Sequence, residues 1–220
     1  MTSSNALLTR LAALALVIAG ILFVLYPAIR PFSDEVSLQG AAAFASSAWL
    51  VAHSLAMVGF ILLMLGLLGL YGLLRETRAG GLGIVAVVVT LIGVCCTLPY
   101  YGAETFALHA VGQEALKLQN VDLYVTLTNA IRYGEGIWFF GVGLLALAAG
   151  TILFAVAIWR SGILPRWSGI PLAVGFALFI PQFFTPQPVR VAHGLLIMAG
   201  CLVLAWSMWS FMGGKSAAKR

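Results

Sequence analysis

The chain has 220 residues, of which 62% are hydrophobic and only 9% are charged, with a formal net charge of +5 at pH 7. Soluble domains carry about 25% charged residues, so this composition excludes an ordinary water-soluble globular domain. It also argues against a nucleic-acid-binding protein, because no basic stripe with interleaved aromatic residues is present. We therefore take the lipid bilayer as the solvent and main partner of the chain, with no nucleic-acid partner.

The apolar residues form runs that are long enough to cross a membrane. A spanning helix takes about 20 apolar residues, and sheets with open edges cannot span lipid. We predict an all-α membrane protein: a six-span transmembrane helical bundle that forms one domain over residues 1–220. The predicted spans are residues 11–29, 54–74, 81–101, 136–159, 167–182 and 191–212. The fifth span is the shortest, and it contains Pro171 and Pro181.

The longest polar connection, residues 102–132, still has a helical pattern. Its apolar residues recur with the period of one helix face, and Asp122 is suited to cap a second helix. The apolar face consists of Leu108, Val111, Ala115 and Leu118. We therefore expect this connection to form a small helical cap on the outer face of the bundle.

The distribution of charge predicts the orientation of the bundle, because cytoplasmic loops are enriched in Lys and Arg. With both termini inside, eight cations are cytoplasmic: Arg10, Arg75, Arg78, Arg160, Arg166, Lys215, Lys219 and Arg220. Four cations lie outside: Arg30, Lys117, Arg132 and Arg190. We predict a multi-pass protein of the plasma (inner) membrane with both termini cytoplasmic, whose inner cations contact lipid headgroups.

Two short segments match each other. Residues 51–55 read Val-Ala-His-Ser-Leu and residues 191–195 read Val-Ala-His-Gly-Leu. The next cation follows at the same spacing in both, Arg75 after His53 and Lys215 after His193. This match predicts two histidines at one depth on helices that run in the same direction. It also suggests a parallel repeat of the first two and the last two spans, as in some transporters.

The paired histidines are the main candidates for chemistry. Neutral imidazoles bind haem iron or divalent metals, so His53 and His193 could hold a b-type haem whose propionates meet Arg132 and Arg190. Alternatively, Glu104, which shares the apolar stripe of the cap, or Glu135 would complete a His₂-carboxylate set for zinc or iron. A third hypothesis is that both histidines only satisfy hydrogen bonds at the membrane interface. The motifs Cys-x-x-Cys-His and His-Glu-x-x-His are absent from the sequence.

Two further polar features have simple interpretations. Arg132 and Glu135 lie three positions apart, which predicts a local ion pair. His109 falls on the polar stripe with Gln113 and Lys117, so we expect it to be solvated.

Three functional hypotheses follow. The first is a polytopic membrane protein with an outer-half polar site that binds haem or a metal ion through His53 and His193. The second is a small-molecule binder or transporter, although no ionisable group lies at the predicted midplane for a coupling ion. The third is a non-catalytic scaffold, an oligomer or a subunit of a membrane complex. The sequence assigns no catalytic residue and leaves open whether the protein is an enzyme.

Overall fold

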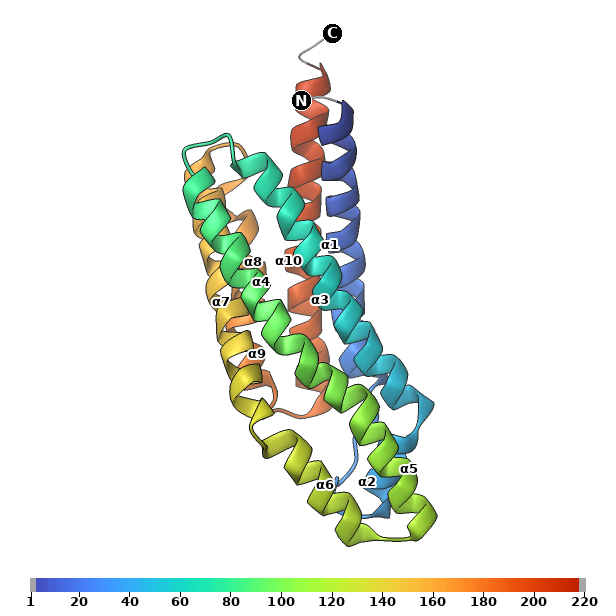
Figure 1. Ribbon diagram of the computed structural model, residues 1–220. Coiled ribbons are helices and arrows are strands. Elements are labelled where there is room, and N and C mark those ends of the chain that lie inside the picture. Colours follow the sequence, from blue (N-terminus) through green and yellow to red (C-terminus); the bar gives the residue numbers. More distant parts are fainter. Residues whose placement is uncertain (1–2, 218–220) are drawn as a thin grey trace.

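The structure is a computed structural model that describes the backbone of residues 3–217 and the side chains of residues 6–212. Throughout that part of the chain every regular element is a helix (Figure 1). Five of these helices are long and apolar enough to cross a membrane. They are α1 (Ser3–Ile29), α3 (Ser47–Leu74), α4 (Gly80–Gly102), α7 (Gly136–Ser161) and α10 (Gln187–Ala217). The prediction of an all-α, membrane-type chain is thus confirmed at the level of helix content and composition.

The predicted fifth span, residues 167–182, is not one continuous helix. It is divided into η2 (Arg166–Gly169), α8 (Ile170–Ala177) and α9 (Phe179–Gln182). Pro171 lies in the first turn of α8, where its missing N–H is tolerated. Leu178 then leaves the helical conformation, with φ −90° and ψ 5°. The six-span count is therefore not confirmed by helix length.

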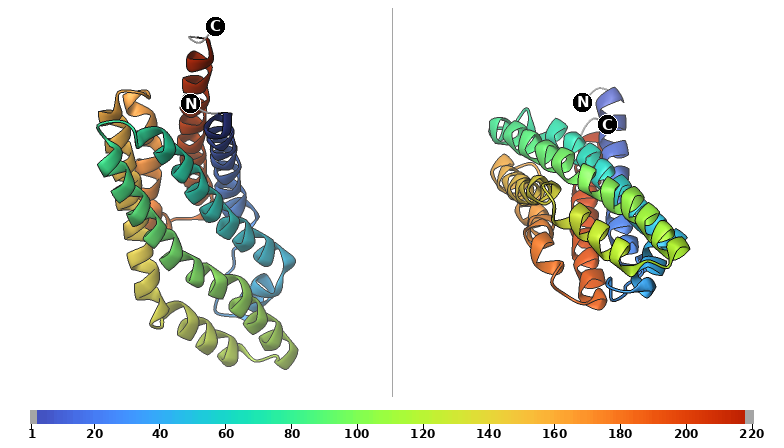
Figure 2. Two further views of the ribbon diagram at one scale, coloured as in Figure 1. Left: turned by 45° about the horizontal axis from the view of Figure 1, so that its top comes forward. Right: turned by 60° about the horizontal axis from the view of Figure 1, so that its bottom comes forward.

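The long helices pack through small residues. α1 packs along both α3 and α10, and α4 packs along α7 (Figure 2). A Cβ added to Gly93 of α4 would lie 2.7 Å from the backbone nitrogen of Leu147 in α7. A Cβ on Gly194 of α10 would lie 2.5 Å from the carbonyl oxygen of Phe23 in α1. Such close backbone approach through glycine is typical of helices that associate in membranes.

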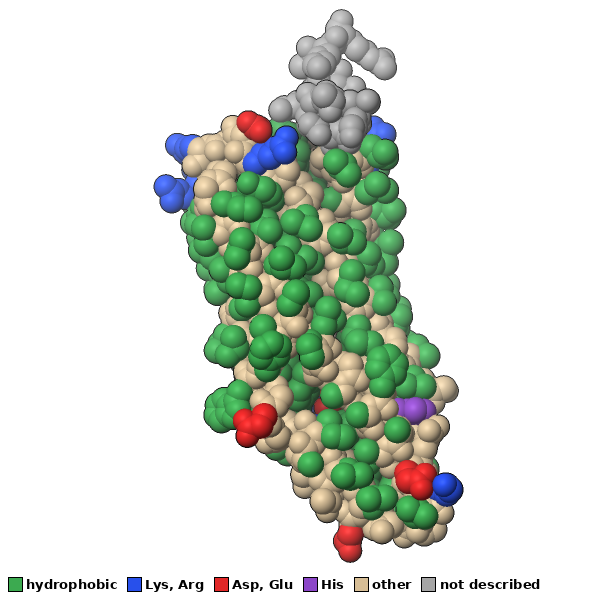
Figure 3. Space-filling model, in the orientation of Figure 1, with side chains coloured by type: hydrophobic (Ala, Val, Ile, Leu, Met, Phe, Trp, Pro, Cys, Tyr) green, Lys and Arg blue, Asp and Glu red, His purple; other side chains and the backbone are tan. Residues whose placement is uncertain are grey.

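The two ends of the bundle differ in structure. The termini end holds the start of α1, the end of α10 and the turns at 75–79 and 162–165 (Figure 1). The cap end holds four short helices: α2 (Leu38–Ala45), η1 (Ala103–Ala107), α5 (Leu108–Leu118) and α6 (Val121–Tyr133). On the face drawn in Figure 3, cations lie along the termini end and a hydrophobic band separates them from a cap end with acidic side chains. The predicted helical cap over 102–132 is present.

The cap has a small hydrophobic core of its own. Phe44 of α2, Trp49 of α3, Leu108 of α5 and Tyr124 of α6 are fully buried against one another. Ser46 separates α2 from α3 and caps α3, because its hydroxyl accepts a hydrogen bond from the Trp49 backbone N–H. The chain thereby turns at residue 46, which places α2 beside α5 rather than in line with α3.

The suggested repeat is not confirmed. α3 and α10 run in the same direction (Figure 1), and each histidine stands at the seventh position of its helix, His53 counted from Ser47 and His193 from Gln187. The partner elements differ, however. α1 is a continuous helix of 27 residues, whereas the segment before α10 is broken into three pieces.

Candidate functional site

The candidate site begins with an irregular turn at the base of the cap. α4 continues through η1 into α5, and residues Ala103–Ala107 form a π-helix within this continuous stretch. Single π turns inside α-helices are frequent at functional sites. Glu104 lies in this turn and its side chain is buried. The indole Nε1 of Trp49 donates a hydrogen bond to the Glu104 carbonyl at 2.6 Å, which holds α3 against the π turn.

Four charged side chains form a network around this turn. Arg132 of α6 donates to both carboxylate oxygens of Glu104, from Nε at 2.7 Å and from Nη2 at 3.0 Å. The Nη1 of Arg132 also donates to Glu35. Arg30, at the end of α1, donates to the other Glu35 oxygen at 3.0 Å. The charge network Arg30–Glu35–Arg132–Glu104 thus ties α1, the chain before α2, α6 and η1 together with charge-assisted hydrogen bonds.

Aromatic rings cover the two arginines of the network. The guanidinium carbon of Arg30 lies 4.8 Å from the ring centroid of Trp49 and 4.6 Å from that of Phe32. Arg132 lies 5.0 Å from the ring centroid of Phe44. Cation–π contacts of this kind strengthen when they are shielded from water. The network is therefore part of the cap's packing and not a solvated surface pair.

The charges of the network stabilise one another. Burial alone would raise the pKa of Glu35, but Arg132 and Arg30 outweigh burial and hold this pKa below its ordinary value. Burial alone would lower the pKa of Arg132, but Glu104 and Glu35 raise it well above the ordinary value. Both groups therefore remain ionised near neutral pH. Removing one partner of such a buried set costs about 3–5 kcal/mol, because a charge is left unpaired.

His53 lies beside the network. Its Nδ1 is 2.9 Å from the carbonyl oxygen of Trp49, and since a carbonyl only accepts, Nδ1 carries the hydrogen. Its Nε2 lies 3.7 Å from Oε2 of Glu104, which exceeds hydrogen-bonding distance. The ring also packs against Tyr26, with centroids 5.3 Å apart. His53 thus contacts a carboxylate without being joined to it.

His193 has a separate set of contacts. Its Nε2 is 2.7 Å from the carbonyl oxygen of Gly175 in α8, and its ring meets the edge of Phe179 at 5.3 Å. Each histidine therefore satisfies a different backbone carbonyl. This agrees with the hypothesis of histidines that only satisfy hydrogen bonds.

The metal hypothesis receives no support from the geometry. Among the residues that the structure describes, no group of three or more His, Cys, Asp or Glu side chains could hold a metal ion. His53, Glu104 and His193 are thus not gathered into the predicted His₂-carboxylate set. Arg132, expected to meet a haem propionate, is instead occupied by two carboxylates. Haem or metal binding through His53 and His193 remains a prediction from the sequence.

Arg190 differs from the other arginines of the cap end. Its Nε donates to the Thr185 carbonyl at 2.9 Å and its Nη2 to the Phe183 carbonyl at 2.6 Å. Its guanidinium carbon also lies 5.2 Å from the ring centroid of Phe32, the ring that Arg30 covers as well. No carboxylate among the described side chains pairs with it. Arg30 and Arg132 thus share Glu35 and Glu104, whereas Arg190 has no carboxylate of its own in the described part of the chain.

A small cavity adjoins Arg190. It has a volume of about 20 Å³ and lies between α1, α9 and α10. Its polar border consists of Tyr26, Arg30, Gln182, Arg190 and His193, and apolar residues including Phe32 complete the wall. A cavity of this size holds about one water molecule. Two guanidinium groups at its border make it suited to an oxygen atom that carries negative charge.

Three sequence predictions about polar residues are wrong. Arg132 pairs with Glu104 and Glu35 instead of the local Glu135. His109 is half-buried rather than solvated, and its Nδ1 lies 2.8 Å from the Phe44 carbonyl oxygen. The cap of α6 is Asn120, whose side chain accepts from the Leu123 N–H at 2.9 Å, rather than Asp122. In the first two cases a tertiary contact across the cap forms where helix spacing alone predicted a local ion pair or a solvated side chain.

Sequence reasoning missed three members of the site: Arg30, Glu35 and Trp49. Arg30 directly follows the first predicted span, residues 11–29. This position was a detectable signal, because a cation at the end of a membrane helix can serve as the counter-ion of a buried acid. Glu35 had none, because it lies in a non-helical connection and adopts a left-handed backbone conformation, φ 56°. Non-glycine residues rarely adopt positive φ, and the sequence gives no warning of it here.

Comparison with known proteins identifies no relative of this chain. No protein-family model, no curated protein and no solved structure matches this chain. The functional argument therefore rests on the residues of the cap end.

Proposed function

We propose that the protein binds the acidic group of a small molecule or ion at its cap end, with Arg190 as the main contact. The observation that carries this proposal is the contrast between two arginines. Arg132 is neutralised by Glu104 and Glu35, whereas Arg190 borders a cavity and contacts two carbonyls and the Phe32 ring, with no carboxylate partner among the described side chains. This favours the hypothesis of a small-molecule binder or transporter over that of a scaffold.

The physical argument concerns an uncompensated cation. Arg190 is only partly buried, and the two carbonyl oxygens compensate its guanidinium only in part, so a negatively charged partner would stabilise it further. Arg30 and Arg190 also lie over the same Phe32 ring, so two positive charges converge at one side chain. An anion in the adjoining cavity would give Arg190 a negatively charged partner. It would also reduce the repulsion between the two guanidinium groups. The planar fork of Arg190 suits a carboxylate or phosphate group.

The size of the cavity limits what enters it. About 20 Å³ accommodates one oxygen atom or a small ion and not a whole organic molecule. The rest of a larger ligand would extend past Phe32, which is 37% exposed. We therefore propose a small inorganic anion or the acidic end of a larger molecule as the ligand class.

We also propose that the chain crosses the membrane six times. α7 ends at the termini end and α10 begins at the cap end, so the segment between them must return through the bundle. The broken helices α8 and α9 would make that return. With the cation-rich termini end in the cytoplasm, the acidic cap and the Arg190 cavity would face the outside of the plasma (inner) membrane.

Thermal unfolding of purified protein with a panel of anions tests the binding proposal. The panel contains chloride, phosphate, acetate and succinate as salts of one cation, each at matched ionic strength. A ligand that binds only the folded state raises its stability with concentration. We expect at least one anion to raise the melting temperature saturably, and Arg190→Gln to abolish that rise.

Arg160→Gln is the matched control, because Arg160 is an exposed arginine at the opposite end of the bundle. It should leave the anion response unchanged. The proposal is wrong if no anion stabilises the wild type, or if the response persists in Arg190→Gln.

A further inference from the structure

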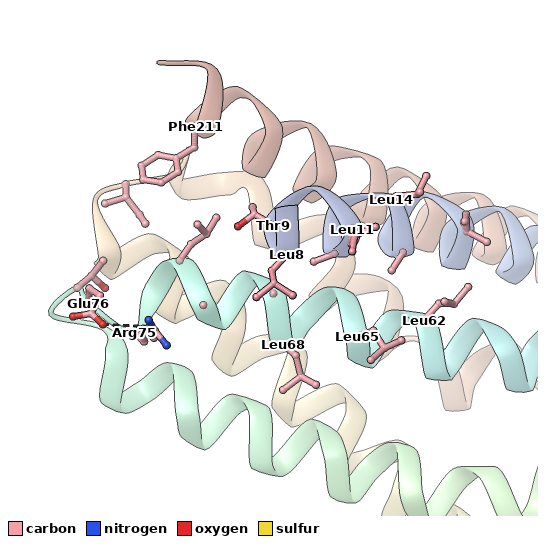
Figure 4. A pocket seen from close by; sticks show the side chains of 18 residues that line it. Leu8, Thr9, Leu11, Leu14, Leu62, Leu65, Leu68, Arg75, Glu76 and Phe211 are labelled. Atoms are coloured by element: carbon pink, nitrogen blue, oxygen red, sulfur yellow. Dashed lines mark ion pairs between the residues drawn. The ribbon is translucent and has the colours of Figure 1, made fainter. Parts of the chain in front are cut away.

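A long groove opens at the termini end between α1 and α3. α1 lies close against α3 as far as Gly69, where an added Cβ would collide with the side chain of Ala12. One turn further, a Cβ on Gly72 would meet nothing within 4 Å. An open groove of about 1000 Å³ runs along this line of helix contact and is lined by residues of both helices (Figure 4). Pockets for small molecules have volumes of about 300–1,000 Å³, so the groove is at the upper end of that range.

The walls of the groove are largely apolar along residues 8–18 of α1 and 62–73 of α3. Figure 4 shows leucines from both helices along its length, among them Leu11 and Leu14 of α1 and Leu65 and Leu68 of α3. These four leucines are between 42% and 53% exposed. An apolar groove of this kind suits a hydrocarbon chain, because neither the groove walls nor the chain requires a hydrogen-bond partner.

The polar groups gather at one end of the groove. Arg75 and Glu76 lie where α3 ends, and Figure 4 shows them together at the mouth. Their ion pair, 3.2 Å between Nε and Oε1, joins two neighbours in the chain whose side chains are 51% and 82% exposed. Such exposed pairs contribute little, so the guanidinium of Arg75 remains able to bind a stronger anion.

We propose that this groove binds an anionic phospholipid, with an acyl chain lying in the groove along α1 and α3 and the phosphate at Arg75. The groove is apolar along its length and ends at a cation. A phospholipid has the matching arrangement, with acyl chains followed by a negatively charged phosphate. Juxtamembrane cations attract anionic lipids of the cytoplasmic leaflet. The lipid therefore comes from the leaflet at the termini end, which is the cytoplasmic one in the proposed topology.

This lipid site is independent of the anion site at Arg190. The two lie at opposite ends of the bundle and share no lining residue. Failure of one proposal therefore leaves the other unaffected.

The test uses the full chain in nanodiscs that contain phosphatidylcholine with a minor share of spin-labelled phosphatidylglycerol. Gly72→Phe places a ring in the groove, which Gly72 lines, and its Cβ would meet no atom within 4 Å. Gly141→Phe is the matched control, since a Cβ on this glycine of α7 also meets nothing within 4 Å. We expect the wild type and Gly141→Phe to immobilise the labelled lipid, and Gly72→Phe to lose that component while its melting temperature stays close to wild type.

The headgroup is tested by a second pair of variants. The wild type should prefer phosphatidylglycerol over phosphatidylcholine about five-fold, the ratio expected for one cation at an anionic surface. Arg75→Gln should reduce this preference towards one, and Arg160→Gln should retain it. Equal immobilisation of both lipids by the wild type would overturn the proposal, as would retention of the labelled lipid in Gly72→Phe.

Discussion

Arg132 donates two parallel hydrogen bonds to the carboxylate of Glu104, at 2.7 Å and 3.0 Å, although the residues stand on different helices. Glu104 lies in the π turn that follows α4, and Arg132 lies in the last turn of α6. The pair therefore joins the π turn at the base of the cap to the end of α6. Because both side chains are only 11% exposed, removal of either partner would leave a buried charge unpaired.

Replacement of Glu104 by Gln should destabilise the protein strongly. Arg132 would keep Glu35 but lose its bidentate partner, and breaking a buried charge pair costs about 3–5 kcal/mol. The measurement is the free energy of unfolding in mixed micelles. Glu114→Gln is the control, because the Glu114–Lys117 pair is exposed, and it should change stability by less than about 0.5 kcal/mol. Equal effects of the two variants would show that the network is not a stabilising element.

The stability of the cap should fall in acid through Glu35. The pKa of this residue lies below its ordinary value of 4.5 in the folded protein, because Arg132 and Arg30 outweigh the effect of burial. Its contribution is thus fully present above pH 4.5 and is lost as the pH falls through the lowered folded pKa. Melting temperatures from neutral pH into the acid range should fall more steeply for the wild type than for Glu35→Gln. Parallel profiles would contradict the assignment.

Purified protein should show neither a Soret band nor stoichiometric zinc. The reason is that His53 and His193 bind separate carbonyls, those of Trp49 and Gly175. An absorption spectrum and elemental analysis for iron, zinc and copper check this expectation. A Soret band that disappears in both His53→Ala and His193→Ala would restore the paired-ligand hypothesis and contradict this interpretation.

The sequence predicts the long elements of the fold well because the signal for them is local. Runs of apolar residues require helices in lipid, and the stripe that contains Leu108 places Glu104 on the buried side of the cap. Both residues are indeed buried. The same stripe predicted a helix from Leu108 to Leu118, and α5 spans these residues.

The partners of the charged residues could not be predicted because they depend on how separate elements meet. Spacing on one helix favoured Glu135 for Arg132, but the chain before α2 and the π turn bring Glu35 and Glu104 closer. The matched histidine segments indicated equal positions on parallel helices. They could not indicate that one histidine would bond within α3 and the other to α8.

The central claim is that Arg190 carries the uncompensated charge that binds an acidic group. Equilibrium dialysis with a radiolabelled form of the anion that stabilises the protein most tests it directly. We predict one bound anion per chain and an affinity about 10- to 100-fold lower in Arg190→Gln, the loss expected for one charge-assisted hydrogen-bonded contact. Saturable binding with unchanged affinity in Arg190→Gln, or no saturable binding to the wild type, would contradict the account.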